Sequence, residues 1–133
     1  MSFDVDVQLV DKYFDQGFPR SVVEEAFRSY MHPIDAGLYR LTYPEGGSSD
    51  LYLEQTPVIN GFGVMAAGGN TLYDGIYKIM SNVPHLYMYW GGGSVVTDPA
   101  TIPLMPDGLI KEFGSPTVVH SGQEIIDAIE RGP

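Results

Sequence analysis

Residues 70–96, NTLYDGIYKIMSNVPHLYMYWGGGSVV, decide how the rest of the chain can fold. The first half predicts a helix, because its apolar residues recur at helical spacing and form one stripe. Asn70 stands where an N-cap is expected, and Pro84 ends the helix because proline has no N–H to donate. Residues 86–90 are apolar or aromatic on both faces, so they predict a strand that is covered on both sides, at the centre of a sheet.

Shorter strands are predicted around this helix–strand pair. Residues 3–9 alternate strictly between apolar and polar side chains, which indicates a half-buried strand with an acidic outer face. Residues 37–43 and 50–58 predict a hairpin, and residues 61–66 predict a third strand after it. Consecutive strands of this kind favour a mixed or mainly antiparallel sheet.

Two further helices are predicted from capping boxes, in which a serine and a glutamate three residues later satisfy backbone N–H groups. Ser21 and Glu24 open the first, over residues 21–31, and Ser121 and Glu124 open the last. The chain of 133 residues is therefore expected to be a single globular domain, 1–133, of the α+β class. About three helices should lie mostly on one face of a single sheet.

Composition limits where the protein works. The chain has no cysteine, which excludes disulfides and thiolate metal sites and fits a cytoplasmic location. The first residues, MSFDVDV, lack the basic and apolar regions of a signal peptide, and the apolar runs are too short to cross a bilayer.

Net charge is the first indication of function. Seventeen acidic residues against seven basic ones give a formal charge of −10. Nucleic acids and anionic membranes are therefore poor partners, whereas opposite fields would speed encounter with a basic protein. The alternative is that the charge serves solubility alone.

Catalytic signatures are weak throughout the chain. His32, His85 and His120 have no second histidine at metal-ligand spacing, and Ser121 is better explained as an N-cap than as a nucleophile. The glycine-rich stretch AAGGNTLYDG has no lysine after it and predicts a turn rather than a phosphate cradle. The sequence therefore predicts no catalytic residue, no metal and no cofactor.

The best candidate binding surface is the polar face of the predicted sheet. If the first strand and the 50–58 strand belong to one sheet, five side chains point outward together: Asp4, Asp6, Asp50, Tyr52 and Glu54. Carboxylates would steer a basic partner and the tyrosine would supply contact area. An ordinary solvated face is the competing interpretation, since antiparallel sheets normally have one polar side.

An aromatic pocket is the alternative site. Tyr87, Tyr89 and Trp90 precede three glycines, which could form a lip beside a small ligand or a substrate. A wide turn or a bulge explains the same glycines. Aromatic contacts could also assemble a homodimer, and the sequence leaves this open.

The C-terminal third of the chain resembles a known kind of protein. The segments YWGGGSVV, residues 89–96, and IPLMPDGLIKEFGSPTVVHSGQEIIDAI, residues 102–129, are similar to small acidic bacterial proteins of the immunity type, found in toxin systems. The resemblance implies a non-enzymatic inhibitor that binds and occludes a basic toxin or effector. It rests on structural residues, so it supplies no catalytic residue.

Overall fold

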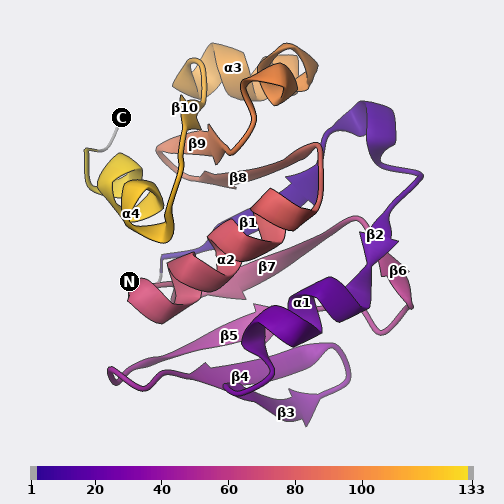
Figure 1. Ribbon diagram of the computed structural model, residues 1–133, viewed down its shortest axis with the longest axis vertical. Coiled ribbons are helices and arrows are strands. Elements are labelled where there is room, and N and C mark those ends of the chain that lie inside the picture. Colours follow the sequence, from indigo (N-terminus) through magenta and orange to yellow (C-terminus); the bar gives the residue numbers. More distant parts are fainter. Residues whose placement is uncertain (1–2, 132–133) are drawn as a thin grey trace.

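The computed structural model describes residues 3–131, and its framework is an eight-stranded sheet (Figure 1). All neighbouring strands in it are antiparallel except one parallel pair at an edge, so the α+β prediction with a mainly antiparallel mixed sheet is confirmed. In spatial order the strands are β10 (Thr117–Val118), β9 (Gly93–Val96), β8 (Leu86–Trp90), β1 (Val5–Leu9), β7 (Gly61–Met65), β5 (Ser48–Tyr52), β4 (Leu38–Thr42) and β3 (Met31–Asp35).

The strand predicted to be central, residues 86–90, is not at the centre of the sheet. β1 and β7 occupy the two central positions, and β8 lies one place further out, between β1 and β9. β8 is nevertheless covered on both faces as expected, with four of its five residues buried. β8 lies there because β1 pairs with β7 on one side and with β8 on the other.

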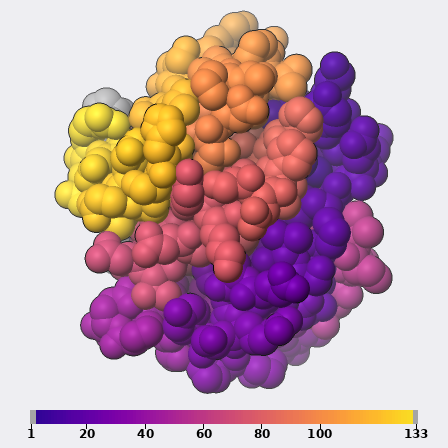
Figure 2. Space-filling view, in the orientation of Figure 1, coloured from indigo at the N-terminus to yellow at the C-terminus, as the bar shows by residue number. Residues whose placement is uncertain are grey.

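Three helices cover one face of the sheet: α1 (Arg20–Phe27), α2 (Asn70–Asn82) and α4 (Gly122–Arg131) (Figure 1). Figure 2 shows this face filled by these helices and their flanking segments. The stripe of α2 expected from the sequence is buried here, and Ile125 and Ala128 of α4 pack into the same core. Alternate residues of the strands complete the core, among them Val5 and Val7 of β1.

Among the described residues, helices cover the opposite face only at its β8–β9–β10 end. There the 3₁₀ helix η2 (Pro99–Leu104) and the helix α3 (Asp107–Phe113) lie over the strands. A second small core forms beneath them from Val10, Tyr87, Val96 and Met105. The described residues thus contain four α-helices and two 3₁₀ helices, the other being η1 (Asp11–Tyr13), more than the three expected.

The start of α2 differs from the prediction that Asn70 caps it. The N-cap is Gly69, whose φ of +89° suits glycine, and Asn70 is the first helical residue. The capping carboxylate comes instead from Glu45 in the β4–β5 turn, which accepts hydrogen bonds from the N–H and the hydroxyl of Thr71. A contact between residues 26 apart could not be found from local spacing.

Of the two capping boxes, one is confirmed. The Ser121 hydroxyl oxygen accepts from the Glu124 N–H at 3.1 Å at the start of α4. The box at Ser21 and Glu24 was wrong, because α1 begins at Arg20 and makes no side-chain cap bond. Glu24 instead pairs with Arg20, one helical turn earlier, at 3.4 Å.

The predicted first helix was also too long. α1 ends at Phe27, and residues 31–35 form the edge strand β3. Pro33 is tolerated in this strand because an edge has one row of backbone groups without a strand partner. Two more short strands, β2 (Phe18–Pro19) and β6 (Val58–Ile59), pair with each other beside the main sheet.

Candidate functional site

Across residues 3–131, no helix covers the part of the outer sheet surface that belongs to β1, β7, β5 and β4. We call this surface the open face. Its residues alternate along each strand with residues of the main core. They are Asp4, Asp6 and Gln8 at β1, Gly61, Gly63 and Met65 of β7, Asp50 and Tyr52 of β5, and Arg40 and Thr42 of β4.

Strand register brings the predicted binding residues together on this face. Asp6 lies opposite Gly63 on one side and opposite Tyr89 on the other, and Gly63 lies opposite Tyr52. These pairings place Tyr89, Asp6, Gly63 and Tyr52 in one row across four strands. Glu54 follows two residues after Tyr52, just beyond the end of β5.

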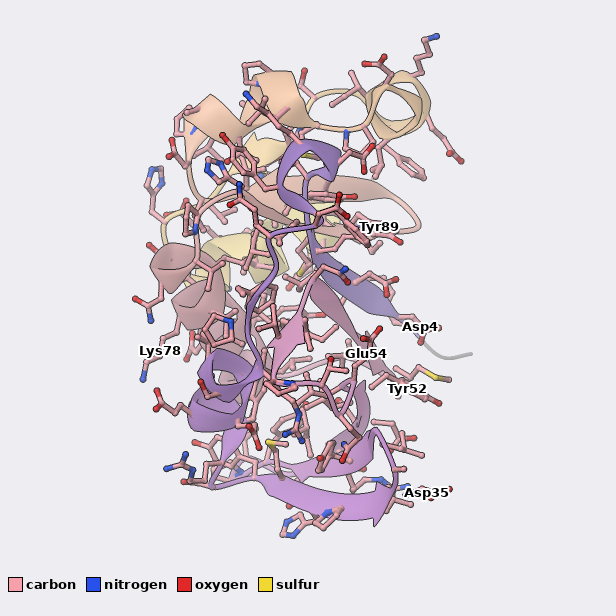
Figure 3. All side chains as sticks on the ribbon, turned by 90° about the vertical axis from the view of Figure 1, so that its right-hand side faces the viewer. Asp4, Asp35, Tyr52, Glu54, Lys78 and Tyr89 are labelled. Atoms are coloured by element: carbon pink, nitrogen blue, oxygen red, sulfur yellow. The ribbon has the colours of Figure 1, made fainter. Side chains whose placement is uncertain are left out.

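Figure 3 shows the molecule turned by 90°, in a view roughly along the strands. Asp4, Tyr52, Glu54 and Tyr89 lie on the side of the sheet away from Lys78 of α2. Asp4 is fixed beside β7, because its carboxylate accepts a hydrogen bond from the Ala66 N–H at 3.3 Å. The five residues singled out from the sequence therefore share one surface.

Asp50 is the member whose charge is balanced. Arg40, opposite it on β4, donates from Nε to the carboxylate at 2.7 Å. This pair is exposed at the surface, so it contributes little to stability. The pairing could not be predicted from the sequence, because it depends on the register of two strands.

Basic residues are otherwise absent from this face. All seven lie within residues 3–131, and six of them are on helices or in the turn that follows α1: Lys12, Arg20, Arg28, Lys78, Lys111 and Arg131. Acidic residues occur on the helices too, so the negative charge of the molecule is general. What distinguishes the open face is its shortage of positive charge.

Asp6 is the most perturbed carboxyl of the open face. Burial raises its pKa above the ordinary value of 3.8, and the neighbouring charge of Asp4 raises it further. Burial likewise raises the pKa of the Tyr89 hydroxyl beside it, with a further contribution from the charge of Asp6. Both side chains are thus partly withdrawn from water at the edge of the covered end.

The alternative aromatic pocket does not form as a unit. Tyr87 and Tyr89 lie on the outer side of β8, whereas Trp90 points to the opposite side and is buried in the main core. Tyr87 is buried beneath η2 and α3, accepts a hydrogen bond from the Gln8 side chain at 3.0 Å, and has a pKa raised by burial to about 12. Strand alternation separates residues that are adjacent in the sequence.

A groove borders the open face and was missed by the sequence analysis. It has a volume of about 630 Å³ and lies between residues 36–37, residues 52–56 and the start of β7. Gly61 and Gly63 leave its floor without side chains. Two glycines at alternate positions of one strand, in GFGVM, were the available signal, since such glycines often mark close approach of another group.

A second cavity of about 420 Å³ lies at the end of the α1–α2 layer. Its lining includes Tyr13 and His85, whose rings stack at 3.8 Å between centroids. His85 has a left-handed φ of +70°, and its carbonyl accepts from the Val10 N–H. The side chain therefore has a packing role against Tyr13.

The other two histidines and Ser121 lie in structural settings. His32 bonds to the Thr42 hydroxyl at 2.9 Å, and His120 approaches the Glu124 carboxylate at 3.2 Å. Ser121 uses its oxygen as the cap of α4. Within the described residues, no three His, Asp or Glu side chains are grouped to bind a metal ion, and no helix is long and apolar enough to span a bilayer.

Comparisons with protein-family models, with curated proteins and with solved structures found no match to this chain. Function must therefore be judged from the chemistry of the open face. Carboxylates, exposed tyrosine and a grooved floor suit contact with a cationic surface.

Proposed function

We propose that this protein is a non-enzymatic binding module that presents its open face to a basic protein. The supporting observation is the distribution of charge, because Asp4, Asp6 and Glu54 share a face on which the single basic side chain, Arg40, is already paired. A positively charged partner would meet a surface of opposite sign without a competing cation at its centre.

The open face also has the contact chemistry of a protein interface. Tyr52 is 45% exposed and Met65 is 37% exposed, and their strands are neighbours. Tyrosine, methionine and arginine are the residue types enriched at such interfaces. This supports binding by an extended flat surface, with the acidic groups giving fast and selective encounter.

By the resemblance of residues 89–96 and 102–129, the partner would be a bacterial toxin or effector, and the protein an immunity-type inhibitor acting in the cytoplasm. Inhibition would be by occlusion, since the open face offers carboxylates and tyrosine that can cover a basic active surface. The two segments of the resemblance lie mostly in β8, β9, η2, α3 and α4, which are beside the open face or on the other side of the sheet, so most of their residues are not part of it.

The test compares two variants with the same net charge. In the first, three acids of the open face are neutralised by Asp4→Asn, Asp50→Asn and Glu54→Gln. In the second, three exposed acids of the helical side are neutralised by Glu25→Gln, Asp127→Asn and Glu130→Gln. The partner is first captured on the wild-type protein, identified by mass spectrometry and purified.

Association rates are then measured at rising ionic strength by stopped flow. We expect the open-face variant to associate at least tenfold more slowly at low salt, and its rate to depend less on salt, while the helical-side variant behaves as wild type. Equal slowing of both variants would show that only overall charge matters and would refute the assignment of the surface.

A further inference from the structure

The groove beside the open face has the size of a ligand-binding site. Its volume of about 630 Å³ lies within the range of roughly 300–1,000 Å³ that is common for such sites. It exists because β5 stops pairing with β7 at Tyr52, while β7 extends on to Gly61. The separation of β5 from β7 opens the groove at the side of the sheet.

The floor of the groove has no side chain at two positions, Gly61 and Gly63. A Cβ at Gly61 would lie 2.6 Å from the Val7 carbonyl oxygen, so no side chain fits there without moving backbone. A Cβ at Gly63 would lie 3.0 Å from the Asp6 carboxylate. Val7, Gln8 and Asp6 of β1 thus pack directly against these two glycines, and the groove at this point is lined by the peptide groups of β7 close to Asp6.

The wall of the groove contains an aromatic ring and a carboxylate. Tyr52 and Glu54 both line the groove and lie two residues apart, about 6.6 Å along an extended segment. Within the described chain, the Glu54 carboxylate makes no ion pair. Gln55, by contrast, is already bonded to the Tyr39 hydroxyl at 3.0 Å.

We propose that this groove receives an arginine side chain from an extended segment of the basic partner, stacked on Tyr52 and paired with Glu54. The inference rests on the proposed function and specifies which cation the open face selects. A guanidinium can stack on an aromatic ring and bond to a carboxylate through two parallel N–H groups, whereas an ammonium is a point charge that does neither as well.

The test uses three peptides, acetyl-Gly-Arg-Gly-amide and its counterparts with lysine or citrulline in the middle. Citrulline keeps the shape of arginine without its charge. Each is titrated into ¹⁵N-labelled protein, and the amide signals of Glu54, Gly61 and Gly63 are followed. We expect saturable shifts at these amides with the arginine peptide, binding about three- to fivefold weaker with lysine, and none with citrulline.

Two variants assign the contacts. Tyr52→Leu and Glu54→Gln change exposed side chains, so both should fold, and each should weaken the arginine peptide about two- to fivefold. Glu25→Gln, on α1, removes an equal charge from the helical side and should have no effect.

Equal binding of the lysine and arginine peptides, or arginine-induced shifts outside the groove, would overturn the inference. These outcomes are separable from failure of the proposed function. If the arginine peptide misses the groove while the triple open-face variant still loses partner association, the face is the partner surface and the groove is not an arginine site. If association is also unchanged, the proposed function itself fails.

Discussion

At the scale of single residues, Asp6 lies on the proposed binding face at a cost to stability. Its carboxyl lies beside Tyr89 and Gly63, partly removed from water and close to Asp4, which is why its pKa is raised. A raised carboxyl pKa means that the folded protein disfavours the charged form, so ionised Asp6 destabilises the fold at neutral pH. Carboxyl groups with perturbed pKa values are more frequent at functional sites, which supports including Asp6 in the proposed binding face.

The change Asp6→Asn should therefore stabilise the protein at neutral pH. Well below pH 3.8, the ordinary pKa of the group, Asp6 is mostly protonated in both the folded and unfolded states, so variant and wild type should differ least there. As pH rises through the raised folded-state pKa, the wild type loses stability relative to the variant. Urea unfolding between pH 3 and pH 7 measures this difference.

The same substitution should slow capture of the basic partner, so stability and association change in opposite directions. A variant that is less stable than wild type at pH 7, or a difference that grows towards low pH, would show that Asp6 is a stabilising carboxylate.

At the scale of elements, local sequence signals predicted most strands and missed contacts between distant segments. The alternation in β1, the hairpin of β4 and β5, and the apolar stripe of α2 are visible in the sequence because one element's own period determines them. The Glu45 cap of α2 and the Arg40–Asp50 pair depend on which segments meet in space. The spacing of residues within one element carries no information about contacts between separate segments.

The edge strand β3 was missed for a related reason. Residues 21–31 were predicted to form a helix, and Pro33 just after them disfavours both helix and sheet interiors. Only the position of β3 at the end of the strand order makes proline acceptable there. For the candidate site, alternation predicted that Asp4 and Asp6 share a face of one strand and that Asp50, Tyr52 and Glu54 share a face of another. Whether these strands belong to one sheet was left as a condition, and the groove required knowledge of where β5 leaves β7.

Packing between α1 and α2 gives a prediction at this scale. In an exposed helix, changing glycine to alanine stabilises by about 0.5–1 kcal/mol. At Gly75 of α2, however, the new Cβ would lie 2.5 Å from the Phe27 ring, which is fully buried and cannot withdraw. Gly75→Ala should therefore destabilise the fold by about 1–3 kcal/mol in urea unfolding.

Gly108 of α3 provides the matched control, because a Cβ there meets no atom within 4 Å. Gly108→Ala should leave stability unchanged or raise it by up to about 1 kcal/mol. Stabilisation by Gly75→Ala comparable to that by Gly108→Ala would mean that α1 and α2 are not in close contact at Phe27.

At the scale of the whole molecule, the two sides of the sheet have different roles. Helices α1, α2 and α4 bury one side and carry three of the seven basic residues, whereas the open face carries one, Arg40, which is paired with Asp50. A net charge of −10 spread evenly over the surface would attract a cation equally from every direction. Under the proposed function, the arrangement of the charges directs a basic partner to the open face.

Carboxyl footprinting tests this most directly. Aspartates and glutamates are coupled to glycinamide with a carbodiimide, in the free protein and in its complex with the purified basic partner, and the modification of each is measured by mass spectrometry. We predict that Asp4, Asp50 and Glu54 are protected in the complex while Glu25, Asp127 and Glu130 react as before. Protection of the helical acids, with Asp4 and Glu54 still reactive, would contradict the assignment of the open face as the binding surface.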